Sequence, residues 1–130
     1  MRDRLEEILQ QLGDQIGESL QVDVHNTCSL TINEVLPLQF ECDANQEWLL
    51  IVSTLGELPA GKFRETILRD ALIANQKSFV EGTLGYSNKI NHLIQFASLP
   101  LSEIDGEKLA SFLLPFLEKA EKWRLKILHT

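Results

Sequence analysis

The chain has few cysteines and no long apolar run, and each of these absences excludes a class of protein. Two cysteines in 130 residues are too few for the disulfide framework that holds many small secreted domains together, so we expect a reducing compartment. No segment approaches the roughly 20 consecutive apolar residues of a membrane span. The charged start, Met1 to Arg4, does not resemble a signal peptide. We therefore predict a cytoplasmic protein with no membrane insertion.

The chain is acidic, and its charge is unevenly distributed. The formal net charge is -7 at pH 7, and residues 1–61 hold eleven acidic side chains against two arginines. An acidic surface repels phosphate backbones and anionic lipids and attracts basic partners. We expect no nucleic acid among the ligands.

The size of the chain fits one domain over residues 1–130. With 44% hydrophobic residues it can bury a real core. No repeat, low-complexity tract or linker interrupts it, so no second domain is predicted.

The N-terminal part is predicted to form a helix followed by three strands. Alternating apolar residues at 28–32 and 38–42 predict two half-buried strands. The nearly continuous apolar run at 48–55 predicts a strand that is covered on both faces and central in the sheet. The helix ends near Gly17, and its apolar stripe consists of Leu5, Ile8, Leu9, Leu12 and Ile16.

The first two strands are expected to pair as a hairpin. Their apolar positions are all even-numbered, so one face stays apolar only if paired residue numbers have an even sum. A loop at residues 34–37 suggests a sum near 70. This register sets Leu30 against Phe40 and Cys28 against Cys42.

The C-terminal part is predicted to add a helix, a second hairpin and a long helix. Apolar residues at helical spacing place the middle helix from Phe63 to about Lys77. The hairpin strands are expected at residues 79–86 and 90–97, after which Pro100 leaves the sheet because it cannot donate to a ladder.

The last helix is predicted to begin at Ser102 or Asp105. Its broad apolar face extends to Ile127. Pro115 lies inside it and removes one backbone donor, so we expect a kink or a short break there.

The sequence that most resembles a catalytic motif is the stretch from Gly56 to Lys62, followed by Phe63. It matches most of a nucleotide-binding P-loop and lies between a predicted strand and a predicted helix. Phe63 replaces the hydroxyl residue that ligates magnesium, and Glu57 adds a negative charge where phosphate would bind. A degenerate P-loop stays open as a remote alternative.

The cysteines and histidines predict neither a nucleophile nor a metal site. His25 and Cys28 are three residues apart, and at strand spacing their side chains point to opposite faces. Adding Cys42 still leaves zinc without a fourth ligand. We expect inert thiols, no metal and no catalytic residue.

The order of elements and several short segments resemble the class I type III secretion chaperones of the CesT/SycE-like family. The similar segments are Gly82-Thr83-Leu84-Gly85-Tyr86, Leu99-Pro100-Leu101 and the helical set Phe116, Ala120 and Trp123. The resemblance implies an α+β fold of order α-β-β-β-α-β-β-α, with a twisted antiparallel sheet flanked by three helices. It also implies a cytoplasmic bacterial protein without enzymatic activity or cofactor, which binds the N-terminal region of a secreted effector or translocator and keeps it secretion-competent.

A receptor for such a partly unfolded client needs an apolar groove and an accessible strand edge. The first helix and first hairpin can supply both, although the same residues would serve equally well as ordinary core. The predicted client-binding residues are Leu5, Leu9, Leu12, Leu30, Ile32, Leu38 and Phe40.

The resemblance further implies a homodimer, in which the second helix and the fourth strand form the interface. This implicates Ile67, Ala71, Leu84 and Tyr86, which internal helix–sheet packing explains equally well. A heterodimer with a second chaperone also stays open. So does an adaptor or regulator of the same fold that binds a transcription or secretion-apparatus protein.

Overall fold

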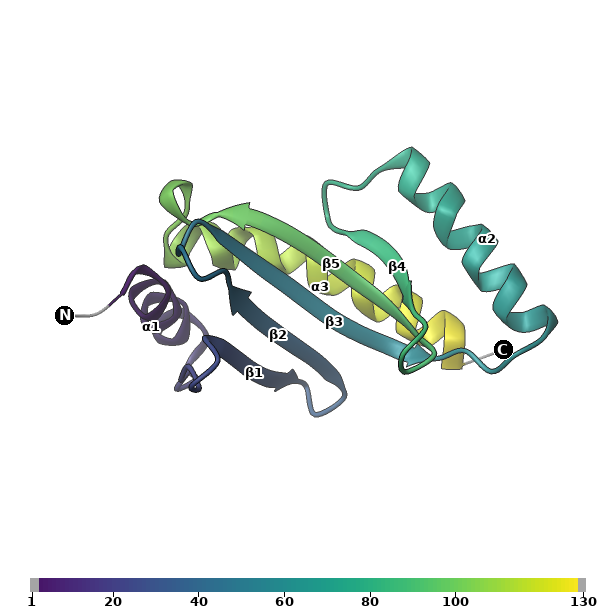
Figure 1. Ribbon diagram of the computed structural model, residues 1–130, viewed down its shortest axis with the longest axis horizontal. Coiled ribbons are helices and arrows are strands. Elements are labelled where there is room, and N and C mark those ends of the chain that lie inside the picture. Colours follow the sequence, from purple (N-terminus) through teal and green to yellow (C-terminus); the bar gives the residue numbers. More distant parts are fainter. Residues whose placement is uncertain (1–2, 129–130) are drawn as a thin grey trace.

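A five-stranded antiparallel sheet with three α-helices forms the part of the chain that the computed structural model describes, residues 3–128 (Figure 1). The order α-β-β-β-α-β-β-α confirms the predicted fold. Among the described residues, no helix has the length and apolar character needed to cross a membrane. The elements are α1 (Arg4–Ile16), β1 (Thr27–Ile32), β2 (Leu36–Cys42), β3 (Trp48–Glu57), α2 (Lys62–Lys77), β4 (Thr83–Ser87), β5 (His92–Pro100) and α3 (Gly106–Leu128), with a short 3-10 turn at Leu101–Glu103.

Helix α1 has defined ends. The Asp3 carboxylate accepts a hydrogen bond from the Glu6 N–H at 2.8 Å, which satisfies one of the free donors of the first turn. The helix ends as predicted at Gly17, which adopts a left-handed conformation with φ of 74°. Such a conformation costs glycine little, because it has no Cβ.

The β1–β2 hairpin has a different register from the predicted one. Leu30 pairs with Leu38, and Cys28 pairs with Phe40, so the register is two residues from the prediction. The cause is a tighter turn, in which Asn33 and Glu34 have positive φ and the next N–H donates to the Ile32 C=O at 3.1 Å. A shift of two residues keeps every side chain on its predicted face.

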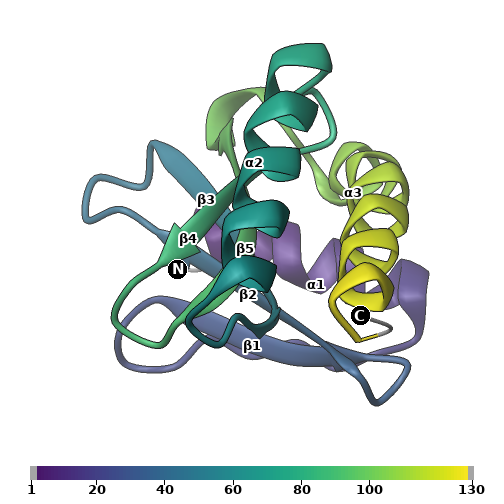
Figure 2. The ribbon, with the colours of Figure 1, turned by 90° about the vertical axis from the view of Figure 1, so that its right-hand side faces the viewer.

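Strand β3 is central, as predicted, because the strand order is β1-β2-β3-β5-β4. The prediction that both its faces are covered is wrong. Its odd-numbered residues from Leu49 to Leu55 are buried, whereas its even-numbered residues are partly or largely exposed and Trp48 is 50% exposed. Helices α1 and α3 lie on the same side of the sheet (Figure 2).

Two apolar clusters form the core, and α3 contributes to both. The larger cluster joins α1, β1, β2 and β3 to the first half of α3, including Leu109 and Phe116. The smaller joins α2, β4 and β5 to its second half, including Ala120 and Trp123. Helix α3 therefore connects the two ends of the molecule.

Helix α3 begins after Asp105, whose carboxylate accepts a hydrogen bond from the Lys108 N–H at 2.8 Å. The expected break at Pro115 does not occur, since the helix is continuous from Gly106 to Leu128. The proline removes the donor for the Ser111 C=O. Both residues are exposed, so water can satisfy that carbonyl.

Both strands of the second hairpin begin and end later in the sequence than predicted. Strand β4 begins at Thr83, because Phe79 starts a turn in which the Gly82 N–H donates to its C=O at 3.0 Å. Strand β5 begins at His92 and ends at Pro100, which pairs with Trp48. Because Pro100 is the last residue of the strand, its missing N–H removes at most one hydrogen bond from the ladder.

Gly106 permits close contact between α3 and α1. A Cβ at this position would collide with the Gln11 side chain and lie 2.8 Å from the Leu12 backbone nitrogen. We predict that Gly106→Ala lowers the free energy of unfolding by about 1–3 kcal/mol, because backbone must move to admit the methyl group. Urea denaturation measures the change. Ser111→Ala, on the exposed face of the same helix, is the control and should change stability by less than about 0.5 kcal/mol.

Candidate functional site

An apolar groove with a volume of about 440 Å³ lies between α1, the β1–β2 hairpin and α3. Apolar side chains form most of its wall, and Glu18, Thr31 and Asn33 are the polar members. The apolar residues that line it are Leu12, Ile16, Leu30, Ile32, Leu38, Phe40, Ala110, Leu113, Leu114 and Leu117.

Five of the seven predicted client-binding residues line this groove, namely Leu12, Leu30, Ile32, Leu38 and Phe40. Among these, Leu30 and Ile32 on the edge strand β1 are partly exposed. Leu12, Leu38 and Phe40 are at most 2% exposed and belong to the larger core cluster as well. The other two predicted residues, Leu5 and Leu9, are 0% exposed in that cluster and do not line the groove. A client could reach them only if α1 moved, so contact with these two is a separate proposal from contact with the groove.

The contribution of α3 to the groove was not predicted. Leu113, Leu114 and Leu117 lie on this helix, about 80 residues along the chain from the first hairpin. Leu114 is 66% exposed, which is unusual for a leucine beside a core helix face. The sequence did contain a sign of this contribution. The apolar face of α3 is wider than packing against the sheet alone requires.

The predicted dimer residues lie largely inside the protomer. Ile67, Ala71 and Leu84 are buried in the smaller core cluster, and Tyr86 packs against it. The apolar residues that α2 exposes are instead Leu72, at 67%, and Ile73, at 45%. A partner on this helix would therefore meet Leu72 and Ile73 first.

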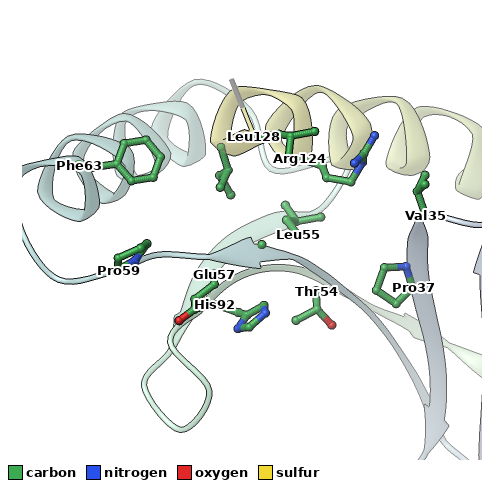
Figure 3. Close-up of a pocket in the computed structure, with 12 residues that line it drawn as sticks. Val35, Pro37, Thr54, Leu55, Glu57, Pro59, Phe63, His92, Arg124 and Leu128 are labelled. Carbon is green, nitrogen blue, oxygen red and sulfur yellow. The ribbon is translucent and has the colours of Figure 1, made fainter. Parts of the chain in front are cut away.

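The P-loop-like stretch lies beside a second cavity of about 580 Å³ (Figure 3). The Leu58 N–H donates to the Asn91 C=O at 2.7 Å, so this amide is not free to bind phosphate. Glu57 lies at the same cavity, and the guanidinium of Arg124 is already held by Glu121 at 2.7 and 2.9 Å. Strand β3 is antiparallel to both neighbours. This geometry gives nucleotide binding no support.

The two cysteines are shielded rather than activated. Burial is the main cause that raises the pKa of the Cys28 thiol, and burial followed by the nearby Asp43 carboxylate raises the pKa of Cys42 to about 11. Within residues 3–128, no three histidine, cysteine or acidic side chains lie close enough together to hold a metal ion.

The five-stranded sheet with helices in this order matches the fold of a type III secretion chaperone. The chain belongs to the Tir chaperone protein (CesT) family, whose model matches residues 7–124. This confirms the resemblance found in the sequence. A search of curated protein sequences finds no match to the chain.

Solved structures share the fold at low sequence identity. A chain of the HopA1–SchA chaperone–effector complex is 22% identical, with a TM-score of 0.75 and 93% of each chain covered. A chain of the ExsC–ExsE complex is 21% identical, with a TM-score of 0.76 and 95% of each chain covered. The structure of the Yersinia pestis type III secretion chaperone SycH with a fragment of YscM2 contains a chain that is 18% identical, with a TM-score of 0.69, covering 92% of this chain and 98% of that one.

Raised thiol pKa values predict slow alkylation, since only the thiolate reacts. At pH 8 we expect iodoacetamide to modify Cys42 at least tenfold more slowly in the native protein than in urea. Mass spectrometry of the Cys28→Ser variant follows Cys42 alone. Equal native and unfolded rates would contradict the shielding.

Proposed function

We propose that the chain is a cytoplasmic type III secretion chaperone without catalytic activity. It binds the N-terminal chaperone-binding region of a secreted effector or translocator and keeps that client soluble and secretion-competent. Membership of the CesT family is the observation that carries this proposal. The chaperone–effector complex among the similar structures is consistent with it.

The apolar groove supports the proposal because it suits an unfolded segment better than a small metabolite. Its wall is a leucine-rich surface built from α1, the β1–β2 hairpin and α3, with few polar groups that could orient a small ligand. An unfolded client presents apolar side chains one after another, and a groove of this kind can bury several of them. Burying one leucine-sized side chain contributes roughly 1.5–3 kcal/mol.

Charge supports a basic client. Glu18 lines the groove, and Asp23 and Glu34 are exposed beside β1. Residues 1–61 carry eleven acidic side chains against two arginines, so this end of the molecule attracts lysine- and arginine-bearing segments. Salt should weaken the attraction, because exposed charges are screened.

The working unit is a dimer in this proposal, with α2 at the interface. The exposed Leu72 and Ile73 support it, since a helix that presents large apolar side chains to water gains by covering them. Ile67, Ala71 and Leu84 would then stabilise the interface from beneath, by holding α2 against β4.

Affinity purification of the tagged protein from its host tests the function directly. We predict recovery of a secreted protein bound through its N-terminal region to two copies of this chain, as measured by mass spectrometry and by the native mass of the complex. Recovery of only cytoplasmic regulators would favour an adaptor instead.

Paired substitutions separate the groove from the core. Leu30→Asp places a charge in the partly exposed groove wall, so we expect a folded protein with at least tenfold weaker binding of the recovered client. Leu9→Asp buries the same charge in the core and should unfold the protein. Circular dichroism and titration calorimetry distinguish the two outcomes.

Ser98→Asp, at an exposed position of β5 outside the groove, is the matched control for Leu30→Asp. It places the same charge on the opposite face of the sheet, so folding and client affinity should both be retained. Unchanged affinity of Leu30→Asp would remove the groove from the proposed binding site.

A further inference from the structure

The turn between α2 and β4 presents two large apolar side chains to water. Phe79 is 68% exposed, and its neighbour Val80 is 74% exposed. Single exposed apolar residues are ordinary on a protein surface, whereas adjacent ones form a patch of the kind that marks an interaction surface. We refer to this pair as the apolar tip.

Hydrogen bonds hold the apolar tip in one conformation. On either side of the turn, the Asn75 amide bonds both backbone groups of Leu84, at 2.9 Å each. Within the turn, the Gly82 N–H donates to the Phe79 C=O at 3.0 Å. The Lys119 ammonium of α3 donates to the Gly82 C=O at 2.6 Å. A tip that is already ordered loses little conformational entropy when it meets a partner.

Lysines flank the apolar tip. The residues on either side of it line a hollow of about 410 Å³ between α2 and α3, and Lys77, Lys119 and Lys122 belong to the same lining. The acidic members are Glu81 and Glu118. The three lysines exceed the two glutamates, although the whole chain has a formal net charge of -7. Such a surface complements an apolar site with a negative rim.

The apolar groove between α1, the first hairpin and α3 has this complementary chemistry. Its wall is mostly leucine and isoleucine, and Glu18 is its charged member. Asp14 and Glu34 are exposed and lie within two residues of lining residues in the sequence. Among residues 3–128, no lysine or arginine lines the groove. The groove therefore offers apolar contacts inside an acidic rim.

The apolar tip cannot reach the groove of its own molecule, because α3 separates them. Leu113 and Leu117 on one flank of α3 line the groove, whereas Lys119 and Lys122 on the other flank line the hollow beside the tip. The exposed side of the helix, which includes Ser111, lies between the two flanks. A tip that enters such a groove must come from another molecule.

We propose that, when no client is bound, the apolar tip of one copy docks in the apolar groove of a second copy. Two copies whose α3 helices face each other along their exposed sides place each tip over the other's groove, so the contact is reciprocal and closes at a pair. The inference rests on the proposed function for the role of the groove, and adds the surface that covers the groove before a client arrives. It is a different contact from the dimer proposed at Leu72 and Ile73.

The contact between copies is weak enough to be reversed. Each copy has a net charge of -7, so two copies repel each other at a distance. The lysines beside the tip offset this repulsion only when they reach the acidic rim of the groove. A client that buries more apolar surface than two side chains therefore displaces the tip.

Photocrosslinking of the full chain tests the contact in the absence of client. A photoreactive benzoylphenylalanine replaces Phe79, and this chain is mixed with an isotope-labelled chain that keeps Phe79. Crosslinks between copies then join one labelled and one unlabelled peptide, which mass spectrometry identifies. We expect the crosslinks at groove residues of the labelled chain, such as Leu30, Ile32 and Leu114.

Substitutions on both surfaces test whether the crosslinks report this contact. Val80→Ser in the photoreactive chain, or Leu30→Asp in the labelled chain, should lower the crosslink yield by about fivefold or more, because a few apolar side chains dominate a small contact. Circular dichroism verifies that each variant is folded. Ile90→Ser is the matched control, since Ile90 is also an exposed apolar residue in a turn, at 50%, and its loss should leave the yield unchanged.

Charge reversal tests the acidic rim. Lys77→Glu together with Lys122→Glu in the photoreactive chain should lower the yield by about two- to fivefold, as expected for exposed charges. Glu18→Lys in the labelled chain should restore part of the yield with this variant and lower the yield with the unaltered tip.

Two results would overturn the inference. Crosslinks confined to Leu72 and Ile73 would assign the tip to the α2 interface, and a lack of crosslinks between copies would show that the groove is uncovered. Affinity purification judges the proposed function separately. Recovery of a secreted client without crosslinks at the groove would leave the chaperone role standing and remove only this cover.

Discussion

The packing of α3 across one face of the sheet is the contact on which the rest of the structure depends. Its first half closes the core over α1 and the first hairpin, and its second half closes the core under α2. Polar contacts fix the position of the helix between these halves. The buried Gln95 amide donates to the Phe116 C=O at 2.9 Å, and the Lys119 ammonium donates to the Gly82 C=O at 2.6 Å. The groove and the exposed face of α2 are therefore held at opposite ends of one rigid helix.

The fold could be predicted largely because its strands and helices have clear periodicity. Alternation placed Leu30 and Phe40 on the correct face, and helical spacing located all three helices. Details that depend on backbone conformation could not be read from periodicity. Positive φ at Asn33 and Glu34 tightened a turn and moved the register by two residues, which an alternating pattern cannot detect because both registers keep the same face. The continuous apolar run of β3 likewise hid the fact that only one of its faces is covered.

The candidate site was only half predictable for a different reason. Leu9 and Leu30 are both leucines at correct spacing, yet one is fully buried and the other lines the groove. The difference depends on which side chains pack over each residue, and α3, which is distant in sequence, contributes those side chains. The spacing of apolar residues within one helix or strand does not reveal which other elements pack against it. Apolar residues outside the core-facing stripe of α3, such as Leu114, were the remaining indication of a groove. A helix that packs only against a core does not need apolar side chains at such positions.

Closing one edge of the sheet also limits how copies of the protein can assemble. A β-ladder that continues through many molecules requires two unpaired edge strands in each molecule, one for each neighbour. Here the Asn75 side chain of α2 bonds both outward backbone groups of Leu84 on β4, with two hydrogen bonds of 2.9 Å. A β-ladder that runs from one copy into the next cannot pass Leu84, so the edge beside α2 is a poor template for adding copies strand by strand.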